Sequence, residues 1–301
     1  MDNLLNRLLA HYHAQPGRTA LIMQQAGQAD TAITYAQLLR GAAGVAQGLR
    51  QQGIHAGEVV ILVQQHGLAL VNSFFGAMLH GAIPAIMPFL TRKLSPEKYQ
   101  ADIRALMGIT QPAAILTETA FMELMAGLSG VGSSARAVVD VSGCQEIQAL
   151  PDLDGFGGTQ RSPDDIVLLQ HSSGTTGLQK GVALSNRAVL RQLDTYSETL
   201  HLTEKDVIVS WLPLYHDMGL IAGFILPLAQ GVRLVLMSPF DWVVAPHRLL
   251  QAVSQYRGTL SWLPNFAYNF CAQKIRERDI AGVDLSSWRS VSNCSEPMRW
   301  E

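Results

Sequence analysis

The 301-residue chain has little cysteine, and the cysteines that it has are isolated. Cys144, Cys271 and Cys294 are far apart, and no Cys-x-x-Cys pair or Cys/His cluster has the spacing of a zinc site. A disulfide framework is therefore not expected, and a reducing compartment, the cytoplasm, is the expected location.

Charge is also scarce and balanced. Charged residues make up 15% of the chain, and the formal net charge is −2. Nucleic-acid binding needs clustered cations that neutralise phosphates. The densest basic group, residues 274–278, is interrupted by Glu277 and is typical of a solvated helix face. We expect no nucleic-acid partner.

Long apolar runs are missing as well. The longest, Met218 to Ala229, contains Pro227 and is shorter than the roughly 20 residues that a transmembrane helix needs. The first residues show no basic region followed by an apolar run, as a signal peptide would. With 48% hydrophobic residues, the composition predicts a globular protein with a large core and no transmembrane segment.

Apolar strands and amphipathic helices alternate along the chain. Residues 34–52 follow a helical period, and residues 59–63 read as a buried strand. Such an order favours largely parallel sheets covered by helices, in an α/β fold with two packed subdomains. The same patterns predict helices at 68–79, 96–107, 120–128, 186–200, 219–229 and 246–256, and strands at 82–87, 113–116, 166–169, 207–209 and 232–237.

A stretch rich in Gly, Asp and Pro, residues 143–163, interrupts this alternation. It is typical of a surface connection between subdomains. We expect an N-terminal α/β subdomain over residues 1–160 and a second over residues 161–301 that carries the phosphate loop described next.

The most informative segment, Ser172 to Val182, reads Ser-Ser-Gly-Thr-Thr-Gly-Leu-Gln-Lys-Gly-Val. Its glycines allow tight turns, its hydroxyls are neutral donors, and Lys180 supplies a cation. A Walker A loop needs four residues between its first Gly and its Gly-Lys ending, whereas Gly174 and Gly177 enclose two. No Gly-x-Gly-x-x-Gly opens the loop either. Phosphate binding is favoured, and a merely flexible turn stays the alternative.

This loop closely resembles the signature loop of the adenylate-forming superfamily, which includes acyl-CoA synthetases, fatty acyl-AMP ligases and nonribosomal peptide adenylation domains. The family pattern is Ser/Thr-Ser-Gly-Ser/Thr-Thr-Gly-x-Pro-Lys-Gly, and the chain departs from it only at Gln179, where proline is usual. The opening region follows the family too, at residues 34–35, 57–60 and 81–85. The resemblance therefore extends over nearly the whole chain.

Two further segments resemble parts of the family's site. Residues 210–220 read Ser-Trp-Leu-Pro-Leu-Tyr-His-Asp-Met-Gly-Leu and are most similar to fatty acyl-AMP ligases and related acyl-CoA ligases. There the His at the position of His216 lies near the acyl carboxylate and phosphate. Residues 293–297 resemble the segment that packs against adenine, with Cys294 and Ser295 in place of a Gly-Ala pair. A purely structural His216 and a buried, inert Cys294 are the alternatives.

The resemblance implies that a carboxylate, here a fatty acid, attacks the α-phosphate of ATP, releases pyrophosphate and forms an acyl-adenylate. CoA or an acyl-carrier protein would then accept the acyl group on a thiol. ATP and Mg²⁺ are the implied cofactors, and His216 and Lys180 the implied catalytic residues. The implied nucleotide-binding residues are Ser172, Ser173, Gly174, Thr175, Thr176, Gly177, Lys180, Asn293, Cys294, Ser295, Glu296 and Pro297. The implied substrate-binding residues are Trp211, His216, Met218, Gly219, Trp262 and Phe266, for whose aromatic members ordinary core packing stays the alternative.

The chain ends at Trp300-Glu301, directly after the segment that resembles the adenine site. The family would next supply an aromatic-Gly-x-Thr-Glu stretch, an acidic ribose ligand and a C-terminal domain with a catalytic lysine. We therefore expect residues 1–301 alone to bind nucleotide weakly and to catalyse adenylation poorly. A non-catalytic nucleotide- or acyl-binding module is the alternative, and the sequence leaves CoA ligase and acyl-AMP ligase both open.

Overall fold

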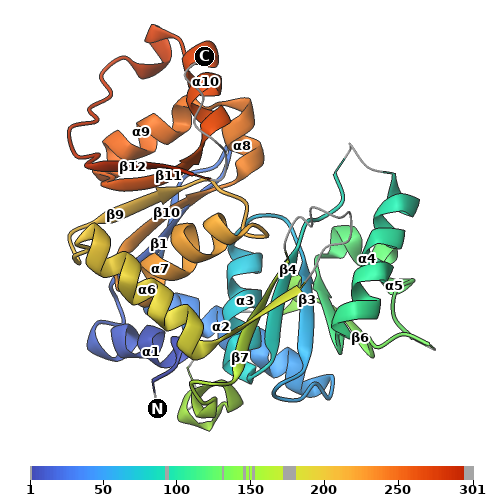
Figure 1. The fold of residues 1–301 in the computed structure, drawn as a ribbon. Coiled ribbons are helices and arrows are strands. Elements are labelled where there is room, and N and C mark those ends of the chain that lie inside the picture. Colours follow the sequence, from blue (N-terminus) through green and yellow to red (C-terminus); the bar gives the residue numbers. More distant parts are fainter. Residues whose placement is uncertain are drawn as a thin grey trace. The chain divides into compact units, whose positions relative to one another are not determined.

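The computed structural model describes residues 2–91, 95–130, 132–144, 147–148, 150, 153–171 and 181–294. The chain divides into two compact units (Figure 1). Unit 1 comprises residues 1–13 and 36–191, and unit 2 comprises residues 14–35 and 192–301. The subdomain ranges 1–160 and 161–301, which follow the order along the chain, stay a prediction.

The described part of unit 1 contains a four-stranded parallel sheet in the order β4-β3-β5-β6. Parallel neighbours need crossover connections, and helices supply them here. The strands are β3 (Val59–Val63), β4 (Ile83–Met87), β5 (Ala114–Thr117) and β6 (Ala137–Asp140). The helices are α1 (Leu4–Ala14), α2 (Tyr35–Gln51), α3 (Leu68–His80), α4 (Pro96–Thr110) and α5 (Met122–Ala126), with short 3₁₀ turns at Thr119–Phe121, Val141–Gly143, Leu153–Gly155 and Gly157–Gln160.

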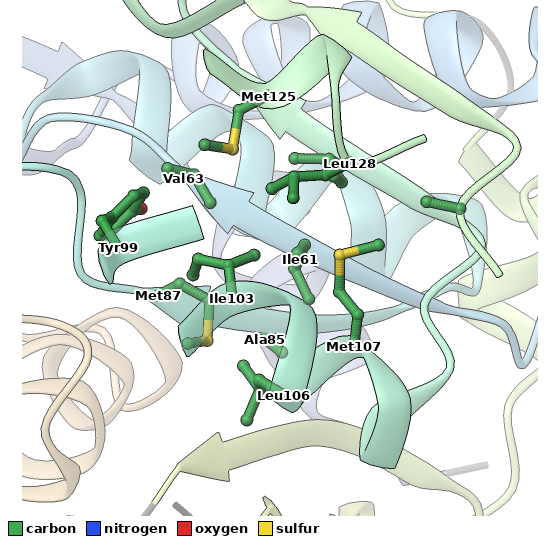
Figure 2. Close-up of a cluster of buried hydrophobic side chains, with 12 residues drawn as sticks. Ile61, Val63, Ala85, Met87, Tyr99, Ile103, Leu106, Met107, Met125 and Leu128 are labelled. Carbon is green, nitrogen blue, oxygen red and sulfur yellow. The ribbon is translucent and has the colours of Figure 1, made fainter. Parts of the chain in front are cut away.

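A buried apolar cluster joins this sheet to α4 (Figure 2). Tyr99, Ile103 and Leu106 lie on one face of α4 because they recur at helical spacing, and they pack with Ile61 of β3. The helix begins where the sequence provides a cap: the Ser95 hydroxyl accepts the Lys98 N–H at 3.3 Å, and proline occupies the next position. The helix α4 thus begins at the cap that the sequence provides, and its apolar face packs on the sheet.

A two-stranded antiparallel sheet also belongs to unit 1. It consists of β7 (Ile166–His171) and β8 (Gly181–Ser185), and β7 contacts β4 (Figure 1). The ladder runs from Ile166 opposite Ser185 to His171 opposite Gly181. The ladder therefore places His171 and Gly181, which flank residues 172–180 in the sequence, opposite each other. The helix α6 (Asn186–Leu200) follows β8 directly.

Unit 2 has, in its described residues, a six-stranded sheet in the order β12-β11-β9-β10-β1-β2. All neighbours are parallel except β1 and β2. The largely parallel α/β fold predicted from the sequence is thus confirmed. The strands are β1 (Thr19–Gln24), β2 (Thr31–Thr34), β9 (Val207–Ser210), β10 (Arg233–Met237), β11 (Leu260–Pro264) and β12 (Ser290–Cys294). The helices are α7 (Leu226–Ala229), α8 (Pro239–Val244), α9 (His247–Tyr256), α10 (Asn265–Lys274) and a 3₁₀ turn at Glu277–Ile280.

The helix predicted at residues 219–229 differs in kind from the one observed. Met218–Ile225 form a π-helix, and only Leu226–Ala229 are α-helical. Two glycines let this wide turn press against its neighbours: a Cβ at Gly219 would lie 2.2 Å from the Pro213 carbonyl oxygen, and one at Gly223 would lie 2.5 Å from Ser210 Oγ. Local backbone contacts, invisible to hydrophobic periodicity, therefore set the helix type.

Across the helices that the structure describes, none is long and apolar enough to span a membrane.

Candidate functional site

The carboxyl ends of β9, β11 and β12 lie at one edge of the unit 2 sheet, because these strands are parallel neighbours. Ligands of open α/β sheets bind outside such carboxyl ends. Predicted site residues follow each strand: Trp211 comes directly after β9, Phe266 opens α10 after β11, and Asn293 lies near the end of β12. Residues separated by more than 80 positions in sequence are thus brought to one edge, which we call the carboxyl edge.

His216 is carried by a turn between β9 and the π-helix. Its N–H donates to the Pro213 carbonyl at 3.2 Å, and its own carbonyl accepts the Leu220 N–H at 2.8 Å. The side chain is exposed, and its ring centroid lies 4.9 Å from that of Tyr215. Asp217 then begins the π-helix by accepting the Met218 N–H at 2.8 Å. The backbone is thus fixed while the imidazole stays accessible.

Gly219 and Met218 continue this segment. Gly219 is buried against the Pro213 carbonyl, so its contribution is a close backbone approach. Met218 is half-buried. π-Helical turns occur often at functional sites because they redirect side chains within a helix. The turn and the start of the π-helix together hold the backbone of His216 in place.

Four aromatic side chains form what we call the aromatic cluster. Trp211 and Trp242 stack with ring centroids 3.6 Å apart and planes 7° from parallel. Phe266 meets both indoles edge-on at 6.3 Å, and Phe270 lies 5.4 Å from Trp242. The structure thus brings together two predicted substrate residues, Trp211 and Phe266, and adds Trp242, which was not predicted.

Trp242 was missed because it belongs to the short helix α8. A sequence signal for that helix exists: Ser238 and Pro239 follow β10, and the Ser238 hydroxyl accepts the Phe240 N–H at 3.2 Å. With the helix start recognised, Trp242 would have been expected near the strand end.

Trp262 lies elsewhere. It is buried in β11, and its ring meets that of Tyr196 in α6 at 6.2 Å, with planes 84° apart. Alternate residues of a strand face opposite sides of its sheet. Trp262 therefore packs against a helix that covers the sheet, whereas Trp211 and Phe266 belong to the aromatic cluster.

Asn293 is held at the end of β12 by a side-chain contact. Its amide nitrogen donates to Asn265 Oδ1 at 3.1 Å, which joins β12 to the start of α10. Its own Oδ1 is buried and has no donor among the residues that the structure describes. An amide oxygen left in this way fits an external N–H donor such as an exocyclic amine. Cys294, opposite Pro264, is the last described residue of this strand.

Several predicted nucleotide-binding residues lie outside the described residues: Ser172, Ser173, Gly174, Thr175, Thr176, Gly177, Lys180, Ser295, Glu296 and Pro297.

His171, directly before the predicted phosphate loop, is described. Its ring is buried, and neither ring nitrogen has a hydrogen-bond partner within the described ranges. Burial lowers the pKa of this imidazole below its ordinary value of 6.5, since a low-dielectric surrounding disfavours the charged form. His171 is therefore neutral at physiological pH.

No group of three or more His, Cys, Asp or Glu side chains could hold a metal ion in the part of the chain that the structure describes. Mg²⁺ bound with a nucleotide keeps several waters and takes phosphate oxygens and one or two carboxylates. A dedicated protein cage is therefore not needed for a Mg²⁺–nucleotide complex.

Comparison with known proteins identifies a family. The profile described as "AMP-binding enzyme" matches residues 9–301. A medium-chain-fatty-acid–acyl-carrier-protein ligase of Moorena producens, JamA, is 30% identical over 310 residues, which cover 100% of this chain and 50% of JamA. A putative fatty-acid–CoA ligase of Mycobacterium leprae, fadD21, is 31% identical over 280 residues, or 88% of this chain and 45% of the relative.

Solved structures agree in fold. The fatty acyl-adenylate ligase of L. pneumophila, solved with acyl adenylate and pyrophosphate, matches with a TM-score of 0.87 and 27% identity. The match covers 99% of this chain and 50% of that one. The chain thus spans about half the length of the relatives that it matches.

Proposed function

The chain belongs to the AMP-binding enzyme family, and we propose that it serves in the ATP-dependent activation of a carboxylic acid to an acyl-adenylate. Its relatives include fatty acyl-AMP ligases and acyl-CoA ligases, which supports this reaction class. The observation that carries the proposal is the convergence of Trp211, Phe266 and Asn293 at the carboxyl edge of one largely parallel sheet, with His216 on the turn that follows Trp211.

In the proposed reaction a carboxylate oxygen attacks the α-phosphorus of ATP. The new P–O bond forms as the bond to the β-phosphate breaks, and pyrophosphate leaves with the electron pair. A carboxylate is already ionised at neutral pH, so no general base is needed. Holding two anions together and stabilising the phosphate charge are the main requirements.

Each proposed residue has a task suited to its chemistry. The exposed His216 would hold the carboxylate beside the α-phosphate by hydrogen bonding. Asn293 would accept from the exocyclic amine of adenine through its buried Oδ1, which has no donor among the described residues. Lys180 and the hydroxyls of residues 172–176 would bind the pyrophosphate end. Mg²⁺, when bound, would neutralise part of the phosphate charge.

The proposed substrate is a fatty acid, whose chain would lie against Trp211, Met218 and Phe266. The proposed acceptor is the thiol of CoA or of an acyl-carrier protein. Both acceptors occur in the names of relatives, and JamA is named for a carrier protein. A location in the cytoplasm belongs to the same proposal.

Two measurements on the 301-residue chain test the proposal. Calorimetric titration with Mg²⁺-ATP measures nucleotide binding, and ATP–pyrophosphate exchange with saturated fatty acids of graded length measures adenylation. We expect weak nucleotide binding, and a low exchange rate that depends on the added acid. His216→Ala should lower the exchange rate by at least about 10-fold, the lower range for a positioned catalytic group.

His13→Ala is the matched control, because His13 is also an exposed imidazole but lies at the end of α1 in unit 1. It should leave binding and exchange unchanged. A folded chain that binds neither ATP nor an acyl-adenylate analogue would contradict the proposal. Nucleotide binding without exchange would favour a non-catalytic binding module instead.

A further inference from the structure

The two stacked indoles of the aromatic cluster each carry an N–H donor. Trp211 is 3% exposed and Trp242 is 0% exposed, so both indoles are buried. Neither Nε1 has an acceptor among the described residues. Buried indole N–H groups normally find an acceptor, because losing water without a replacement is unfavourable. Two such donors in one stack are therefore suited to an acceptor on a bound ligand.

The route to the stack runs past Phe266. This ring meets both indoles edge-on, and 47% of its surface is exposed, so it lies between the stack and solvent. Rotation of a half-exposed phenylalanine is a cheaper rearrangement than movement of a strand or a buried indole. Displacement of this side chain is therefore the cheapest way to open a path from solvent to the stack.

The helices that carry Trp242 and Phe266 also present apolar side chains to solvent, at Phe240 and Val244 of α8 and at Tyr268 of α10. Bringing a charged group into so buried a place costs more than bringing a neutral one, so the acceptor that suits these N–H groups is a neutral oxygen.

We propose that Trp211 and Trp242 recognise an oxygen atom on the acyl group of the substrate. The preferred acid then carries a ketone, hydroxyl or ether oxygen within an apolar chain. The inference rests on the proposed function, since it assumes that the acyl group lies at the carboxyl edge. The apolar carbons lie along the aromatic side chains, and one or both indole N–H groups donate to the oxygen after Phe266 has moved aside.

The test is a binding series on the folded 301-residue chain. Decanoyl-sulfamoyl-adenosine, a stable mimic of an acyl-adenylate, is compared with isomers that carry one ketone at successive chain carbons. We expect at least one ketone position to bind about 10-fold more tightly than the plain chain, the gain of about one hydrogen bond. Equal or weaker binding of every ketone isomer would overturn the inference.

Variants then assign the gain to the indoles. Replacement of Trp242 by benzothienylalanine, which keeps the ring shape but has sulfur in place of N–H, should reduce the ketone preference by several-fold and leave the plain analogue unaffected. The same replacement at Trp211 tests the second donor. Benzothienylalanine at Trp288 is the control, because the Trp288 Nε1–H already donates to Ser261 Oγ outside the aromatic cluster, and the ketone preference should persist.

The outcomes separate the two proposals. Binding of neither analogue would refute the acyl-adenylate function itself. Tight binding of both analogues with equal affinity would leave that function standing and refute the oxygen recognition. A ketone preference that survives both benzothienylalanine replacements would likewise refute the role of the indoles.

Discussion

Replacing Gly219 with alanine should destabilise the protein more than any ordinary Gly→Ala change. An added Cβ would lie 2.2 Å from the Pro213 carbonyl oxygen, 2.9 Å from the Pro213 carbonyl carbon and 3.1 Å from Leu212 Cβ. Real Cβ atoms essentially never approach other atoms within 3.0 Å, so the backbone must shift. The obstacle is main chain, which cannot rotate away as the end of a flexible side chain can.

The expected cost follows from overpacking. Inserting a methyl group into a closely packed site costs typically about 1–3 kcal/mol, and a backbone obstacle favours the upper part of that range. We therefore predict that Gly219→Ala lowers the free energy of unfolding by about 3 kcal/mol. Because the Pro213 carbonyl also accepts the His216 N–H, the displacement should disturb the turn that carries the imidazole.

Urea unfolding of the wild type and Gly219→Ala measures this cost. Gly108→Ala is the matched control: Gly108 lies in α4, and a Cβ there would meet nothing within 4 Å. Alanine has the higher helix propensity, so this control should stabilise the protein by up to about 1 kcal/mol. Similar unfolding midpoints for the two variants, or a Gly219→Ala midpoint at or above the wild type, would refute the reasoning.

Three further predictions concern stability. Trp242→Ala should lower the free energy of unfolding by about 3–5 kcal/mol, because Trp242 is fully buried. Phe266→Ala, at a half-exposed position, should cost less than half as much in the same urea assay. Equal costs for the two variants would contradict the cluster geometry. Burial lowers the pKa of His171 in the folded protein, so the His171 imidazole binds a proton more tightly in the unfolded chain than in the folded one. Stability should fall as pH drops below about 6.5, and His171→Phe should flatten that part of a pH–stability profile relative to the wild type. Arg289, whose side chain is 39% exposed, donates to the carboxylate of the buried Asp206 at 2.9 and 3.2 Å. Asp206 keeps its hydrogen bonds from Thr203, so Arg289→Leu should cost about 1–3 kcal/mol in urea unfolding, and a cost below about 0.5 kcal/mol would show that the pair is dispensable.

Much of the fold could be predicted because its long elements have strong periodic patterns. The helix expected at residues 186–200 and the strand expected at residues 59–63 match the observed bounds of α6 and β3. The helix expected at 96–107 starts at the observed residue because Ser95 and Pro96 form a recognisable N-terminus. Short elements such as β2 and α8 have too few residues for a period to be recognised.

The pairing of elements could not be predicted from the sequence pattern. Residues 14–35 belong to unit 2, where β1 pairs with β10, more than 200 positions further along the chain. Hydrophobic periodicity reports which face of a strand is buried but does not identify its partner. For the same reason, nothing in the local sequence indicated that Trp242 stacks on Trp211 while Trp262 packs against Tyr196.

The site was predicted more from motif than from physics. Composition and spacing alone reached only a phosphate-binding loop, and the roles of His216 and Asn293 came from the family resemblance. The structure shows that the His216 imidazole is exposed and that the Asn293 amide oxygen has no donor among the described residues. Both properties depend on tertiary neighbours, which a sequence pattern does not contain.

The central claim is that an acyl-adenylate binds at the carboxyl edge of the unit 2 sheet. Photo-crosslinking tests it most directly, with a decanoyl-sulfamoyl-adenosine that carries a diazirine near the end of its acyl chain. Mass spectrometry of the digested 301-residue chain should locate the adduct in the peptides that contain Trp211, Trp242 or Phe266, and excess unlabelled analogue should suppress it. Competable labelling confined to peptides of unit 1, such as those of β3 or α4, would contradict the account.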